Sequence, residues 1–218
     1  MILSVNKIIG SAVYRTRKML NNDQSFIDGL SKYNYTEVNF ANDCLFDDKF
    51  HLWYYPGTPE EISTILNQLN KIIEGQKLKF PAIFNYNTFK QTKTDKGTIV
   101  SLNLAIVART FTEWTTGERD NKVFDTVLRP VYEALVKSLK RPYIRWADGF
   151  INPTHDYYEV FTTGQNKEVV ENRYTDHLDA IELHNLRLVI SESDCERYKE
   201  EIEREYNLVL EDLNNLIQ

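Results

Sequence analysis

Residues 79–86 read KFPAIFNY and residues 98–114 read TIVSLNLAIVARTFTEW, and these two stretches decide the fold class. Both are rich in the β-branched and aromatic residues that favour strands. The polar residues 87–97 between them predict the loop of a long hairpin. Side chains of the second stretch alternate between two faces of the predicted strand. One face carries both apolar and polar residues and ends at Arg109, and we expect this mixed face to contact a neighbouring molecule. The opposite face is predicted to lie in the core and carries Val100, Leu102, Leu104, Ile106 and Ala108.

Two helices are predicted on either side of this hairpin. The first begins at the capping box Thr58-Pro59-Glu60-Glu61, with proline at the first helical position, and is expected to end at Gly75. The second is expected over residues 119–140, with a kink at Pro130. Each helix carries a single apolar stripe, so both are predicted to pack on the same side of the sheet.

Weaker signals predict the remaining elements. A basic amphipathic helix comes first, followed by a polar connection over residues 21–48. The final helix begins at Ser193, with a capping box to Glu196. Further strands are expected over residues 50–55 (stopped by Pro56-Gly57), 157–163 and 180–190.

The predicted fold class is α+β, a two-layer sandwich of a mainly antiparallel sheet with helices packed on one face and helical arms at both ends. We divide the chain into a basic helix with a polar extension (1–47), an α+β core domain (48–192) and an acidic C-terminal helix (193–218).

Composition and charge exclude several classes of protein. The chain has 218 residues, a formal net charge of −6, and 42% hydrophobic and 27% charged residues, which is typical of a globular protein. An acidic total argues against a dedicated nucleic-acid binder. No apolar run approaches the length of a membrane helix, and the basic cluster near the N-terminus follows the apolar residues instead of preceding them as in a secretory signal. We therefore expect a cytoplasmic protein without membrane contact. Cys44 and Cys195 show no disulfide or zinc spacing.

The charge is polarised between the two ends of the chain. Residues 191–218 hold nine acidic and three basic side chains, so they account for the whole net charge, whereas four basic residues precede the first acidic one, Asp23. This polarity predicts either pairing of the ends within one subunit or head-to-tail pairing between subunits; two solvated helix faces are the simpler alternative. Tyrosine and tryptophan in polar surroundings also favour interfaces. The candidate interface residues are Arg15, Arg17, Lys18, Trp53, Tyr55, Arg109, Glu200 and Glu203.

Catalytic motifs are missing from the sequence. The eight glycines are scattered singly, and no nucleophile elbow, zinc-binding helix or redox cysteine pair occurs. We therefore predict a protein that is not an enzyme and has no cofactor or metal. The weaker alternatives are a metal site at His177 with Asp176 and Asp179 or at His155 with Asp156, and a nuclease site at Asp156 and Glu159 followed by Lys167. An enzyme acting on nucleic acid or a small phosphate-bearing substrate would instead need Asp156, Glu159 and Asp176 to converge around a metal. Three lysines at the hairpin loop predict contact with a phosphate backbone, unless they simply solubilise the loop: Lys90, Lys93 and Lys96.

The middle of the chain resembles the tail-terminator and tail-completion proteins of tailed bacteriophages. About 90 of the 218 residues carry the resemblance, beginning with the helix TPEEISTILNQLNKIIEG, the strand start Phe80-Pro81-Ala82-Ile83 and the returning strand at 102–111. The following helix matches the family pattern through Arg119, Phe124, Leu128, Pro130, Tyr132 and Leu135. Its richness in Asn, Lys, Tyr and Ile resembles versions from phages of gut Bacteroidetes, including crAss-like ones.

This resemblance implies a structural virion protein that forms a ring at the neck or tail junction, assembled in the host cytoplasm. Its partners would be further copies of itself, six or twelve in the ring, together with adjacent portal, neck and tail proteins. Contact with DNA in the channel would be non-specific. The residues before Asp48 and after Ser193 exceed a minimal terminator. A monomeric binding or regulatory module is the second hypothesis.

Overall fold

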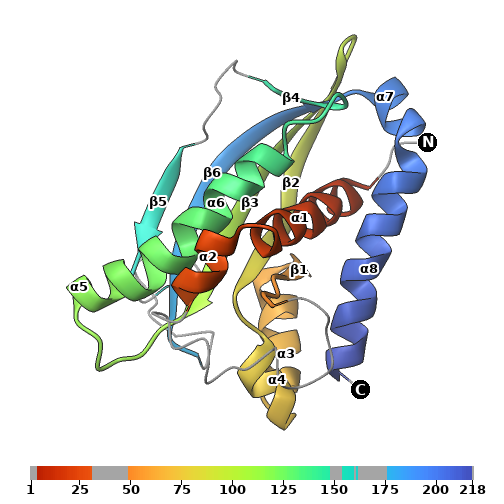
Figure 1. The fold of residues 1–218 in the computed structure, drawn as a ribbon. Coiled ribbons are helices and arrows are strands. Elements are labelled where there is room, and N and C mark those ends of the chain that lie inside the picture. The colour runs from red at the N-terminus through yellow and green to blue at the C-terminus, as the bar shows by residue number, and fades with distance from the viewer. Residues whose placement is uncertain (1–3, 31–48, 148–153, 160, 162–175, 218) are drawn as a thin grey trace.

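The structure is a computed structural model and describes residues 4–30, 49–147, 154–159, 161 and 176–217. A mostly antiparallel sheet carries helices α1 (Val5–Asn21) and α6 (Arg129–Ser138) in front of it in Figure 1. Helix α1 packs on the strands at one end of the sheet, and the helical run that contains α6 packs on those near the other end. The predicted α+β class is confirmed.

Strand order in the sheet is β1-β2-β3-β6-β4, and β5 pairs with β6 outside this path. Among the strands that the structure describes, β1 and β2 are the one parallel pair. Strands β4 and β5 pair with different parts of β6, at Leu188–Ile190 and Ala180–Leu183 respectively. The strand bounds are Trp53–Gly57 (β1), Ala82–Thr94 (β2), Gly97–Arg109 (β3), Ile144–Trp146 (β4), His155–Tyr158 (β5) and Leu178–Ile190 (β6).

The central hairpin is longer than predicted. Residues 90–94 continue β2 and pair with β3, so only Asp95 and Lys96 form the turn, and the predicted loop over 87–97 is wrong. These residues are polar because the outer part of the hairpin is exposed, while the ladder with β3 still pairs its backbone. Gly97 follows the turn with φ of +128°, and a Cβ there would lie 2.3 Å from the Ile190 carbonyl oxygen.

The predicted alternation in β3 is confirmed, with one difference. Its core residues are fully or almost fully buried, and Ile99, Ser101 and Asn103 on the other face are partly exposed. However, Ala105 and Val107 on that second face are also buried. The sheet is therefore covered on both faces at the Arg109 end of β3, and the second face is open only near the hairpin turn.

For the capped helix, the predicted start is confirmed and the predicted end is wrong. Helix α3 (Pro59–Leu69) has the predicted capping box, in which Thr58 accepts from the Glu61 amide. It ends six residues before Gly75, and the separate helix α4 (Ile73–Leu78) follows. Gly75 lies inside α4, at a point where the backbone comes close to the end of α3. A glycine is needed there, because a Cβ would lie 2.5 Å from the Leu69 carbonyl oxygen.

The helical run before β4 is continuous but changes type. It comprises α5 (Thr116–Arg119), the π-helical segment η3 (Asp120–Leu128) and α6. The π-helical segment ends two residues before Pro130, whose missing N–H removes a helical hydrogen bond. The disturbance predicted at Pro130 thus takes the form of a change from π to α hydrogen bonding.

Other boundaries differ from the sequence-based predictions by a few residues. Strand β1 begins later than expected and runs through Pro56, which is tolerated because β1 is an edge strand. Strand β5 covers the beginning of the predicted strand over 157–163, whose later residues lie largely outside the described part. Helix α2 (Gln24–Gly29) lies within the predicted polar connection. The C-terminal helix is split at Tyr198 into α7 (Glu192–Arg197) and α8 (Lys199–Ile217), and its cap is Ser191 rather than Ser193.

Both terminal helices are present and pack onto the sheet. Helix α1 contacts β1, β2, α6 and α8, and α8, whose axis lies at a steep angle to that of α1 in Figure 1, also contacts β1. Gly10 permits this approach, since a Cβ on it would lie 2.4 Å from the Tyr206 ring. Among the described residues, no helix is both long and apolar enough to cross a membrane.

Candidate interaction surface

The two oppositely charged ends of the chain pair with each other. Lys7 binds Glu203 at 2.8 Å, Arg15 binds Glu205 at 2.6 Å, and Arg17 forms an ion pair with Asp212. Each pair joins α1 to α8. Of the two modes of pairing that the sequence leaves open, the structure shows the one within a single chain.

Because of this pairing, some of the residues that were predicted to lie at a subunit interface are largely buried within the chain. The Arg15 side chain is only 12% exposed and that of Arg17 only 6%. Lys18 and Glu203 are partly exposed, and the pKa of Glu203 is lowered by its hydrogen bond from Lys7. Glu200 remains exposed on α8. The basic residues Arg15 and Arg17 therefore hold the chain's own helices together, and are not surface residues as predicted.

The predicted aromatic interface residues lie in the core. Trp53 and Tyr55 are 1% and 0% exposed. The indole N–H of Trp53 donates to the Leu78 carbonyl, and the Tyr55 hydroxyl donates to the Lys79 carbonyl at 3.2 Å. Because each polar tip has a partner inside the chain, these side chains are fully buried without an unpaired polar group. Their prediction as surface contacts is wrong.

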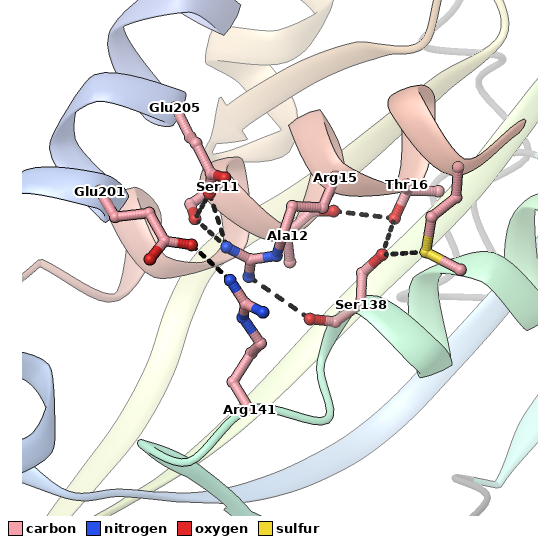
Figure 2. A network of polar contacts seen from close by, with 9 residues as sticks. Ser11, Ala12, Arg15, Thr16, Ser138, Arg141, Glu201 and Glu205 are labelled. Atoms are coloured by element: carbon pink, nitrogen blue, oxygen red, sulfur yellow. Dashed lines mark hydrogen bonds and ion pairs between the residues drawn. The ribbon is translucent and has the colours of Figure 1, made fainter. Parts of the chain in front are cut away.

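A polar network connects α1, α8 and the end of α6 (Figure 2). The Arg15 guanidinium donates to Ser11 and Glu205, both at 2.6 Å, and to the Ser138 carbonyl at 3.4 Å. Arg141 lies beside it and pairs with Glu201 of α8. This network positions two guanidinium groups at one junction of three helices.

A second branch of the network fixes α1 to α6. The Thr16 hydroxyl lies 2.8 Å from the Ala12 carbonyl and 3.0 Å from the Ser138 hydroxyl. The junction is therefore well connected, although the buried Nε of Arg15 has no hydrogen-bond partner among the described residues.

The three hairpin lysines do not share one surface. Lys90 pairs in register with Ser101 on the open sheet face, whereas Lys93, three residues along the strand, points to the opposite face and lies 3.3 Å from Glu192. Lys96 is in the turn. A spacing of three residues brings side chains together on a helix but separates them on a strand.

The open face of the sheet has a mixed apolar and basic character. Strand register places Thr92, Ile99, Val189 and Arg145 in one row across four strands. The next row holds Lys90, Ser101 and Arg187. We call these seven residues the open sheet face. Its three charged side chains are all basic: Lys90, Arg145 and Arg187.

Sequence reasoning missed two of these cations. Arg187 lies in a strand that was predicted, and its alternation with buried Leu186 and Leu188 was the available signal. Arg145 lies in the three-residue strand β4, which is too short for periodicity to reveal. Arg109, which was predicted on the mixed face, lies at the far end of β3 and donates to the Gln76 carbonyl at 3.4 Å.

The residues of the weaker metal-site and nuclease hypotheses each contact a different side chain, so they are not gathered at one site. Asp176 binds Lys79 at 2.5 Å, Asp179 binds Arg119 at 3.1 Å, and Glu159 accepts from Thr116 at 3.2 Å. Asp156 lies 3.2 Å from His184, and His155 packs against the Tyr132 ring. In the described part of the chain, no three such side chains gather as metal ligands. Lys167 lies outside the described residues.

Glu182 is a buried acidic side chain on β6. It is 5% exposed, and burial raises the pKa of its carboxyl group, an effect that His184 opposes and Asp156 reinforces. The carboxyl lies 3.6 Å from the His184 ring, too far for a hydrogen bond.

Comparison of the chain with protein-family models, curated proteins and solved structures gives no match.

Proposed function

We propose that this chain is a structural protein that associates with further copies of itself through the open sheet face, as a ring component of the phage tail-terminator type. The observation that carries the proposal is the mixed face itself. Helices cover the opposite side of the same strands, whereas Ile99 and Val189 remain partly exposed between three cations. Apolar residues bordered by charges are typical of protein interfaces.

The outer side of α8 offers a complementary surface. Glu200 and Glu211 are both exposed, and their spacing of 11 residues, about three helical turns, places them on one side of the helix. The exposed Arg204 lies on the same side, so this surface carries two acidic side chains and one basic one. Because α8 and the open sheet face are different surfaces of the chain, contact between them would be head-to-tail. Interfaces of this kind close into rings when the rotation between subunits permits it.

The revised interface replaces the one expected from the charged ends. Arg15 and Arg17 are already paired within the chain, so the sheet cations Lys90 and Arg145 are the ones that we expect to meet a neighbour. The ring would present acidic helices to basic strands, and its association would weaken as salt screens the charges.

The test is particle mass by light scattering over a range of protein concentration and salt, with negative-stain images of large species. We expect concentration-dependent assembly that Lys90→Glu and Glu200→Lys each weaken. Lys93→Glu is the matched control, since it makes the same charge change on the opposite face of the same strand. A chain that stays monomeric at every concentration, or equal effects of K90E and K93E, would contradict the proposal.

A monomeric binding module is the second candidate, and a cavity favours it. A cavity of about 480 Å³ lies between α1–α2 and the η3–α6 run. This volume is within the range of small-molecule sites. Monomeric mass together with ligand-dependent stabilisation of the chain would favour this function over the ring.

A further inference from the structure

The cavity of about 480 Å³ has two helical walls. One wall comes from the end of α1 and from α2, and the other from η3 and α6 (Figure 1). Three apolar residues of its lining are buried: Leu20, Phe26 and Ala134. Each wall also carries a carboxylate, Asp23 on the first and Glu133 on the second. The cavity therefore combines an apolar lining with an acidic side chain on either wall.

Both carboxylates keep oxygen atoms that can accept further hydrogen bonds. Asp23 accepts from the amides of Ser25 and Phe26 through one oxygen, at 3.0 and 3.2 Å, which fixes its position at the start of α2. Its second oxygen accepts no hydrogen bond from a described residue. Glu133 is exposed and forms neither a hydrogen bond nor an ion pair within the described ranges.

The wall that contains η3 also offers a backbone acceptor. At the end of η3, the Arg129 amide donates to the Phe124 carbonyl, five residues back. The next bond of this kind would reach the Asp125 carbonyl, but Pro130 has no N–H to donate. Asp125 and Pro130 both line the cavity. A ligand with N–H groups can take the place of the missing helical donor, and π-helical turns are frequent at functional sites.

The charges around the cavity leave a negative surplus. Arg129 pairs with both Asp120 and Asp125, so these three side chains together carry one negative charge. The two wall carboxylates add two more, and Lys137 cancels one, which leaves a surplus of two. The helix ends do not change this sum. Lys137 lies in the last turn of α6 and Asp23 at the start of α2, where the dipoles offset about half a charge in opposite senses.

From this arrangement we infer that the cavity binds an aliphatic diamine, with one ammonium group at each wall. An ammonium has three N–H donors and no acceptor, which suits a site whose free groups are oxygen atoms. One ammonium would donate to Asp23, and the other to Glu133 and the Asp125 carbonyl. The methylene chain between them would pack on Leu20 and Phe26. The two positive charges of the ligand equal the surplus of negative charge.

This inference names a ligand class for the second candidate function, on whose cavity it rests, and it does not depend on ring formation. Particle mass tests the ring and calorimetry tests the diamine, so each can fail without the other. If another small molecule stabilises the chain and a diamine does not bind, the binding module is retained and the diamine inference is wrong.

Isothermal titration calorimetry of the full chain with putrescine (1,4-diaminobutane) at physiological salt tests the inference. We expect binding that the double variant D23N/E133Q weakens by at least about tenfold, because each ammonium loses its charged acceptor. Asparagine caps a helix as well as aspartate does, so α2 should be retained. The single variant E133Q, at an exposed side chain, should weaken binding by about threefold or more.

The matched control is D95N/E113Q. It makes the same two chemical changes at exposed residues outside the cavity lining, and it should leave the affinity unchanged within about twofold. Butylamine, which has one ammonium group, should bind at least about tenfold more weakly than putrescine. Circular dichroism melting curves compare the folding of every variant with that of the wild type.

Four results would overturn the inference. Three of them concern putrescine: no binding to the wild type, equal binding to the wild type and to both cavity variants, or an equal loss of affinity in the control. The fourth is equal affinity for butylamine and putrescine, which would show that the cavity holds only one ammonium group.

Discussion

Lys79 shows how a single buried charge is accommodated in this fold. Its side chain is fully buried, and the ammonium donates to Asp176 at 2.5 Å and to the Asn70 side chain. Burial lowers the pKa of Lys79, and Asp176 opposes that shift. The lysine therefore depends on one carboxylate that lies 97 residues away in the sequence.

We expect Asp176→Asn to lower the free energy of unfolding by about 3 kcal/mol, because it leaves the buried ammonium without a counter-charge. Urea denaturation followed by tryptophan fluorescence measures this loss. Glu192→Gln is the control, since the Lys93 side chain in its ion pair is 70% exposed, and it should cost less than about 1 kcal/mol. Similar losses for the two variants would show that Lys79 finds another partner.

His51 is a second buried titratable residue, and it predicts a pH dependence. Burial holds its pKa well below the usual 6.5, and the neighbouring cations Arg17 and Lys18 act in the same direction. Asp212 lies 3.8 Å away on α8 and is already paired with Arg17. The folded chain thus keeps this imidazole neutral at pH values where the unfolded chain protonates it.

Stability should therefore fall as the pH drops below about 6.5, since the unfolded state then binds a proton that the folded state does not. His51→Gln should make this part of the stability curve flatter, as measured by denaturation at a series of pH values. His184→Gln, at a side chain that is 36% exposed, is the control. An unchanged slope in H51Q would contradict the assignment.

At the scale of elements, pairing of α1 with α8 depends on ion pairs that differ in burial. The Arg15–Glu205 pair is shielded, with side chains 12% and 9% exposed, whereas Lys7 and Glu203 are 36% and 35% exposed. Both pairs join the same two helices. A comparison of the two pairs therefore shows how much burial, rather than the choice of helices joined, changes the contribution of an ion pair to stability.

Arg15→Glu should lower the free energy of unfolding by at least about 2 kcal/mol, because it places two carboxylates together in a shielded junction. The exchange R15E/E205R should recover part of this loss. Lys7→Glu makes the same charge reversal at the exposed pair and should have a much smaller effect. Chemical denaturation compares the three variants, and an R15E chain as stable as wild type would show that the junction contributes little.

At the scale of the whole molecule, the last helix contributes a large part of the core. Four apolar side chains of α8 are buried: Ile202, Val209, Leu213 and Leu216. At roughly 2 kcal/mol each, they represent about 8 kcal/mol, which is comparable with the total stability of a typical domain. The helix is therefore expected to fold with the sheet and α1 as one unit.

A chain that ends at Tyr198 should consequently lose its cooperative thermal transition, measured by circular dichroism. If residues 193–218 instead form a separate arm, the core should melt as before without the C-terminal helix. An unchanged melting temperature in the shortened chain would support that division and would contradict a single cooperative unit.

The fold class, the central hairpin, the alternation of β3 and the start of α3 could all be predicted from the sequence, because period and capping are local properties of neighbouring residues. The sequence did not reveal that the polar residues 90–94 continue a strand, because what holds them in the strand is backbone pairing with β3. The sequence also showed that the two ends of the chain carry opposite charge. Charge alone does not decide whether the ends pair within one chain or between two chains.

Three features could be seen only in the folded chain. Arg15 and Arg17 pair with carboxylates of the same chain, and Trp53 and Tyr55 lie in the core. The open sheet face brings together Lys90, Arg145 and Arg187. The physical reason is the same in each case. Contacts between residues that are distant in the sequence depend on how complete elements pack, and that packing is a property of the whole chain.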